Sequence, residues 1–147
     1  MLATIRPDSW NFPLLLHVLG AMVLVGAAAT AVTAEFVSVG SEDPGRLRRV
    51  AFRTMLFVGV PAFFLMHAAA EWIHSKEFGK GSKDPTWVDI GYITADGGGF
   101  FLLIALVLGG IASRRNAGRL GQAAGVFAAI ALGFWLVAVW AMGGKPD

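Results

Sequence analysis

The segment FFLMHAAAEWIH, residues 63–74, places three ionisable side chains in or beside an otherwise apolar run. His67, Glu71 and His74 are spaced at i, i+4 and i+7, which puts all three on one face of a helix. Ionisable groups are costly in bilayer hydrocarbon, so this face should point into a protein interior or a wet cavity, where it is a candidate functional site. The apolar residues before it extend the run, which predicts a helix over residues 50–74.

Three further apolar runs follow the same pattern. With residues 50–74, the stretches 11–37, 87–113 and 119–142 are each long enough to cross about 30 Å of hydrocarbon at about 1.5 Å per residue. Of the 147 residues, 56% are hydrophobic and 15% charged, and the mean hydropathy is +0.64. Because the connections are short, successive helices should be antiparallel neighbours. We predict an all-α polytopic membrane protein with one domain, a four-transmembrane-helix antiparallel bundle over residues 1–147.

The composition also excludes several classes of function. The chain has no cysteine, which rules out disulfides, iron–sulfur clusters and thiolate metal sites. Its net charge is +2, but the basic residues lie in short connections, so they indicate membrane orientation and not nucleic-acid binding. The first apolar run is too long for a signal peptide, although residues 27–34 are small, as at a cleavage site. We treat this run as a membrane span.

The basic residues predict the orientation. One side of the membrane receives seven arginines: Arg46, Arg48, Arg49, Arg53, Arg114, Arg115 and Arg119. The other side receives five basic residues: Arg6, Lys76, Lys80, Lys83 and Lys145. Cytoplasmic connections carry the excess of Lys and Arg, so we predict a multi-pass protein of the bacterial cytoplasmic membrane with both termini outside. All five tryptophans, which are Trp10, Trp72, Trp87, Trp135 and Trp140, then lie toward the outer side, either as an interfacial belt or in an aromatic pocket.

Small residues and a proline indicate how the helices pack. Ala117, Gly121, Gly125, Ala129 and Gly133 repeat every four residues, a stripe that lets another helix approach closely, within the bundle or in a homo-oligomer. Pro61 lacks an amide hydrogen and is expected to kink its helix about two turns before His67.

Counting residues from the helix ends brings several ionisable residues to similar depth. His17, His67 and Asp96 should share one layer, with Glu71, His74 and Asp89 nearer the outer surface. Asp89 has a simpler explanation as a carboxylate at a helix start. Glu35 lies near the other end and should snorkel or pair with an arginine. Asp96 precedes Gly97-Gly98-Gly99, which would weaken a helix or let a flat group approach its backbone.

The leading hypothesis is a redox or electron-transfer protein with haem b near the outer face. His17 and His67 would be axial ligands of a haem between the first two spans, and Glu71 or Asp96 would hold a ligand proton or a water at a propionate. The expected walls are aromatic or sulfur-containing: Met22, Phe63, Phe64, Met66, Phe100 and Phe101. Such a protein would exchange electrons with a quinone or another membrane redox partner, and membrane oxidoreductase activity is one possibility.

Two alternatives stay open. The first is a metal- or proton-handling component, with a divalent ion bound by His67, Glu71 and His74 and completed by His17 or Asp96. Glu71 and His74 have the i, i+3 spacing of carboxylate metal sites in helix bundles. The second alternative is an accessory or assembly subunit, whose polar cluster only fixes the helix register.

The segment LLLHVLGAMVLVGA, residues 14–27, resembles the first helix of small bacterial four-helix membrane proteins. These include the copper-resistance-D-like domain and the HemJ-type protoporphyrinogen oxidase. The resemblance implies haem binding through His17. HemJ-type proteins also carry a functional lysine within a later helix, and the apolar runs of this chain contain no lysine. The missing lysine puts the oxidase activity in doubt, and what the resemblance implies for this chain is haem binding.

Overall fold

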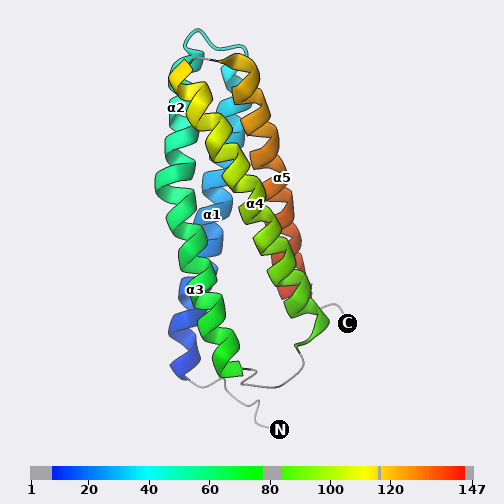
Figure 1. Ribbon diagram of the computed structural model, residues 1–147. Helices are drawn as coiled ribbons and strands as arrows, with labels where there is room; N and C mark the ends of the chain where they lie inside the picture. Colours follow the sequence, from blue (N-terminus) through cyan, green and yellow to red (C-terminus); the bar gives the residue numbers. More distant parts are fainter. Residues whose placement is uncertain (1–7, 78–83, 116, 145–147) are drawn as a thin grey trace.

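The computed structural model of the protein describes residues 8–77, 84–115 and 117–144. Its elements in chain order are η1 (Asp8–Trp10, a 3₁₀ helix), α1 (Asn11–Ser38), α2 (Pro44–Thr54), η2 (Met55–Gly59, a π-helical turn), α3 (Val60–Glu77), α4 (Thr86–Arg115) and α5 (Gly118–Gly144). Because α2, η2 and α3 follow one another without a break, they form one long helix. Four long helices therefore run alternately up and down (Figure 1).

Each of the four long helices is able by length and composition to span a bilayer. The shortest has 27 residues, about 40 Å at 1.5 Å per residue. No more than two charged residues fall in the most apolar window of each helix. The all-α fold with four apolar helices of membrane-spanning length is thus confirmed.

The second helix begins at Pro44, six residues before the predicted start at residue 50. Asp43 caps this helix, since its side chain accepts a hydrogen bond of 3.0 Å from the backbone amide of Arg46. Proline is favoured at the first helical position, which needs no amide hydrogen. Asp43-Pro44-Gly45 is therefore a helix start and not a turn in a loop. The apolar pattern missed it because the first turns of α2 are rich in arginine.

The helix changes its winding just before Pro61. Residues 55–59 form a π-helical turn, and the Val60 amide donates to the carbonyl of Met55, five residues earlier. Pro61 has no amide to continue the regular ladder of hydrogen bonds. The structure thus has a wider turn just before Pro61, and the kink expected there stays a prediction.

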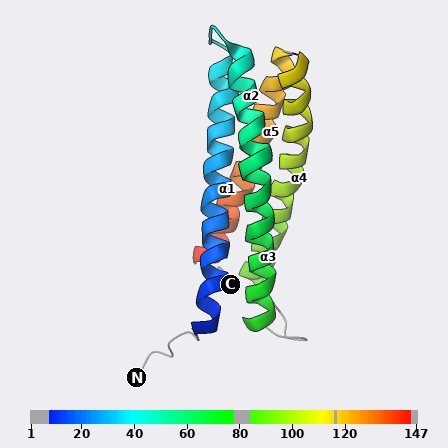
Figure 2. The same cartoon turned by 90° about the vertical axis from the view of Figure 1, so that its left-hand side faces the viewer.

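The helices associate as two pairs. α4 packs along α5, and α1 packs against α3, with further contacts from α1 to α5 and α2. The two pairs lie together near the α1–α2 connection and diverge toward the other end, where α1 begins and α5 ends (Figure 1). Figure 2 shows α1 beside the continuous α2–α3 helix, in front of the other pair. Within one pair, α1 and α3 meet closely at Gly20, where an added Cβ would lie 2.9 Å from the Met66 backbone nitrogen.

The three glycines after Asp96 accommodate aromatic rings of the chain itself. An added Cβ would contact Phe134 at Gly97, Trp135 at Gly98 and Phe63 at Gly99. The Trp135 indole N–H also donates to the carbonyl of Ala95, at 3.3 Å. α4 continues through these residues without a break. The flat groups that lie against the backbone of residues 97–99 are thus aromatic side chains of α3 and α5. The glycines do not interrupt α4.

Two buried ionisable side chains, Glu35 and Arg48, lie near each other at the arginine-rich end. Glu35 and Arg48 are 3% and 6% exposed, and a Cβ on Gly121 would lie 2.8 Å from both Glu35 Oε2 and Arg48 Nε. Gly125 faces the Cβ of Glu35 at 3.0 Å. Glu35 therefore lies beside an arginine of α2 and does not snorkel. The first half of the glycine stripe packs within the bundle, whereas Gly133 faces open space.

Candidate functional site

An apolar cavity of about 640 Å³ lies between the two helix pairs, in the half of the bundle where they diverge. All four long helices line it. Most of its wall is hydrocarbon, and the histidines of the chain, His17, His67 and His74, all contribute to it. Ligand cavities in proteins commonly measure roughly 300–1,000 Å³ and combine apolar walls with a few polar groups. This cavity has the size and polarity of a site for a lipophilic molecule.

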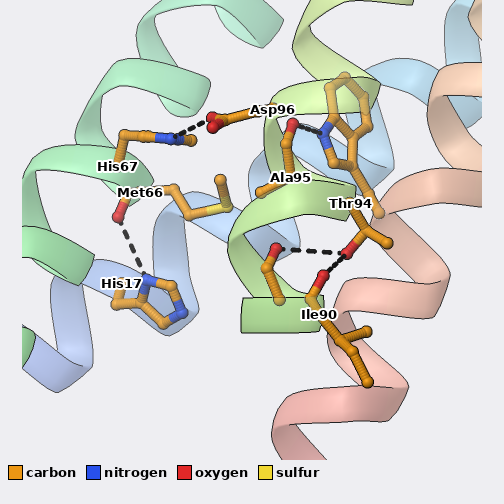
Figure 3. A network of polar contacts seen from close by, with 9 residues as sticks. His17, Met66, His67, Ile90, Thr94, Ala95 and Asp96 are labelled. Carbon is orange, nitrogen blue, oxygen red and sulfur yellow. Dashed lines mark hydrogen bonds and ion pairs between the residues drawn. The ribbon is translucent and has the colours of Figure 1, made fainter. Parts of the chain in front are cut away.

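His17 is oriented by the backbone of α3. Its Nδ1 lies 3.1 Å from the carbonyl oxygen of Met66 (Figure 3). A carbonyl oxygen only accepts, so Nδ1 carries the hydrogen and Nε2 of the neutral ring keeps its lone pair. Histidines that bind metals usually donate their other N–H in this way, to a carbonyl or a carboxylate. His17 thus has a fixed tautomer, with a lone pair on Nε2, on a ring that lines the cavity.

His67 is joined to Asp96, as their predicted common layer required. His67 Nε2 donates to Asp96 Oδ1 across 2.8 Å, linking α3 to α4 (Figure 3). The Asp96 side chain is 67% exposed, although it lies ten residues after the start of α4, roughly 15 Å along the helix. In a bilayer a carboxylate at this depth would be costly, and the imidazole N–H would offset part of that cost.

A second imidazole–carboxylate pair lies nearer the helix ends. His74 Nε2 donates to Asp84 Oδ1 across 2.9 Å. The ring of Tyr92 lies between the two pairs, edge-on to both imidazoles, with centroid distances of 6.4 Å to His67 and 6.0 Å to His74. Sequence reasoning missed Asp84 because it follows a polar connection, outside the predicted spans. It also missed Tyr92, although this tyrosine follows Asp89 by three residues on the same helix.

The remaining predicted residues, Glu71 and Asp89, do not line the cavity. Glu71 is exposed and adjoins the site only through Tyr92. Asp89 is exposed in the first turn of α4, the position of a carboxylate that stabilises a helix start. Within the described residues, no three His, Cys, Asp or Glu side chains are grouped to hold a metal ion. The helical face of His67, Glu71 and His74 is therefore divided, because each histidine pairs with a carboxylate from elsewhere in the chain.

The aromatic and sulfur-containing residues fall into two groups. Met22, Met66, Trp87 and Trp135 line the cavity. Phe64 and Phe100, which were expected to form its walls, point outward and are 65% and 61% exposed. Other expected aromatic residues have structural roles: Phe63 contacts His67 with ring centroids 4.7 Å apart and planes tilted by 37°, Phe101 packs against the core, and Trp72 meets Phe12 edge-on. The tryptophans thus divide between the cavity and the exposed surface.

The packing of α1 against α3 determines where a flat cofactor fits. Gly20 approaches the Met66 backbone, and His17 bonds to the Met66 carbonyl, so the two helices touch at the level of His17 and His67. A porphyrin does not fit between them there. The open space lies instead between the pair α1 and α3 and the pair α4 and α5, where His17 lines the cavity and His67 is bonded to Asp96.

Comparison with known proteins adds no family to this description. No protein-family model, no curated protein and no solved structure matches the chain. The resemblance of residues 14–27 to small haem-binding membrane proteins therefore stays a prediction, and the site is interpreted from its own geometry.

Proposed function

We propose that this chain is a multi-pass membrane protein that binds haem b in the cavity between its helix pairs, with His17 as the axial ligand, and that it transfers electrons. The observation that carries the proposal is the His17 ring, whose Nδ1–H is fixed by the Met66 carbonyl and which lines an apolar cavity of about 640 Å³. Haem in helix bundles requires a ligand of this kind together with apolar walls.

The residues around His17 have separate roles in this proposal. The Met66 carbonyl orients the imidazole and makes its Nε2 a stronger donor. The apolar side chains exclude water, which favours a bound apolar macrocycle. Haem, when bound, supplies a one-electron couple. We assign His67 to its bond with Asp96 and not to ligation, because its other ring nitrogen, Nδ1, is fully buried and does not open to the cavity. The electron partner in this proposal is a quinone, because a quinone and the bound haem would meet within the membrane.

An absorption spectrum tests the proposal. Protein expressed with a haem precursor and purified in detergent is expected to show a Soret band with about one haem per chain. His17→Gly should abolish or shift this band, and added imidazole should restore it. His74→Ala is the matched control because His74 lines the same cavity but is bonded to Asp84. A wild-type protein without a Soret band, or equal spectra for both variants, would refute haem ligation by His17.

Electron transfer is tested separately on the haem-loaded protein. Duroquinol, a reduced quinone, should convert the oxidised spectrum to the reduced one. Failure of this reaction with an intact Soret band would reject the quinone partner and leave haem binding in place.

Proton handling is a second candidate function, and the line of polar groups along α3 and α4 favours it. Asp84 and His74 lie at the helix ends, Tyr92 follows, and His67 with Asp96 lies deeper. Chains of imidazoles and carboxylates serve as proton relays in membranes. The relay would join water at the helix ends to the cavity.

Vesicles containing a pH-sensitive dye test this candidate. Proton uptake driven by a potassium diffusion potential should fall strongly in Asp96→Asn and stay unchanged in His17→Ala. If wild-type vesicles take up protons no faster than empty ones, the candidate is wrong.

A further inference from the structure

A second groove lies between α2 and α4, at the arginine-rich end of the bundle. It has a volume of about 340 Å³. Its lining combines apolar side chains with two arginines: Phe52, Leu106, Val107, Gly110, Ile111, Arg114 and Arg115. Neither the haem proposal nor the proton proposal uses this groove.

The sequence of α4 explains the shape of the groove. Val107, Gly110, Ile111 and Arg114 recur at helical spacing, so they share one face of α4. Gly110 leaves the floor open, because an added Cβ there would lie 3.2 Å from the Phe52 ring of α2. The apolar part of the groove lies toward the middle of the bundle, and the two arginines form its outer end.

The charge distribution along the groove is one-sided. Arg114 and Arg115 are exposed in the last turn of α4, and none of the described lining residues is acidic. Other exposed arginines lie at the same end of the bundle: Arg46, Arg49, Arg53 and Arg119. By contrast, Arg48 is buried near Glu35. The groove therefore presents two guanidinium groups beside a strip of hydrocarbon.

We infer that this groove binds an anionic phospholipid, with the phosphate group at Arg114 and Arg115 and an acyl chain along Val107 and Phe52. Arg114 lies seven residues beyond Val107, roughly 10 Å along the helix, which matches the step from a lipid headgroup to its upper acyl chain. Basic pockets between transmembrane helices bind anionic headgroups, and guanidinium groups suit phosphate oxygens geometrically. The inference rests on the membrane setting of the proposed function but not on haem.

Native mass spectrometry of the detergent-purified chain tests the inference. Phosphatidylglycerol is titrated against phosphatidylcholine, which has the same acyl chains and no net charge. One phosphatidylglycerol is expected to stay bound per chain, and Arg114→Gln/Arg115→Gln should weaken its binding about thirtyfold. Arg46→Gln/Arg49→Gln is the matched control, since it removes the same charge at the same end but outside the groove.

Further measurements distinguish binding of a lipid in the groove from binding of free phosphate and from general attraction to arginines. Gly110→Leu fills the groove floor and leaves both arginines in place. It should weaken the binding of phosphatidylglycerol. Competition by inorganic phosphate at equal concentration would show a free-phosphate site and overturn the lipid assignment. Equal losses in the two double variants would show diffuse attraction and overturn the groove. Whether the chain stays in the membrane pellet after alkaline extraction tests the membrane setting separately from the lipid site.

Discussion

Replacing Gly98 by alanine tests the packing that holds α4 against α5 beside the cavity. The new Cβ would meet the Trp135 indole, with its nitrogen as the nearest atom and with Cδ1 at 2.7 Å and Cε2 at 2.8 Å. Trp135 is 2% exposed and bonded to the carbonyl of Ala95, so the ring has little freedom to move. The methyl group should therefore displace the indole and weaken this bond.

The expected magnitude follows from two opposing terms. Alanine stabilises a helix by about 0.5–1 kcal/mol relative to glycine, whereas overpacking a tight interior costs about 1–3 kcal/mol. Gly133→Ala on α5 is the matched control, because nothing lies within 4 Å of its added Cβ and only the helix term applies. The free energy of unfolding of Gly98→Ala should therefore fall below that of Gly133→Ala by about 1–3 kcal/mol.

Unfolding in detergent micelles, followed by helical circular dichroism, measures this difference. Tryptophan emission should also change in Gly98→Ala, since Trp135 leaves its buried position, and it should not change in Gly133→Ala. If both variants are stabilised to the same extent, then α4 and α5 do not pack at Gly98 as described.

Three further substitutions probe other parts of the bundle, each by the unfolding midpoint in micelles. Glu35→Leu should cost about 3–5 kcal/mol by removing the carboxylate beside buried Arg48, and the double variant with Arg48→Leu should recover most of this loss; additive losses would contradict the pairing. Gly20→Ala should cost about 1–3 kcal/mol by pushing α1 from α3, whereas Gly26→Ala, which faces open space, should show only the helix stabilisation of about 0.5–1 kcal/mol; equal effects would rule out the close approach. Asp43→Ala should cost about 1 kcal/mol through the lost helix cap, and an unchanged midpoint would argue against capping.

The number and length of the helices, and one contact of the site, follow from the sequence. Apolar runs define the spans because hydrocarbon tolerates few charges over about 20 residues. Depth along antiparallel helices then puts His67 and Asp96 in one layer, and the structure joins them at 2.8 Å. This inference needs only a count of residues from the helix ends, because short connections keep the ends of neighbouring antiparallel helices at the same level.

Other parts of the site could not be predicted for physical reasons. The acceptor that orients His17 is a backbone carbonyl, which every residue has, so Met66 gives no sequence signal. The partner of His74 comes from Asp84, just before α4, where no helical register applies. Apolar patterns in membrane helices also do not distinguish lipid from protein interior, and for this reason Phe64 and Phe100 were wrongly assigned to the cavity.

The two ends of the bundle differ in a way that suits a ligand site. Near the arginine-rich end, Gly121 and Gly125 bring α5 onto the buried Glu35 and Arg48, which ties α1, α2 and α5 together. Small residues allow this close packing, and it leaves little room for a ligand between α1, α2 and α5. At the opposite end the helix pairs diverge, and the space between them is bridged by His67 with Asp96 and lined by His17. Tight packing at one end can thus hold the helices in place while the other end keeps a cavity open.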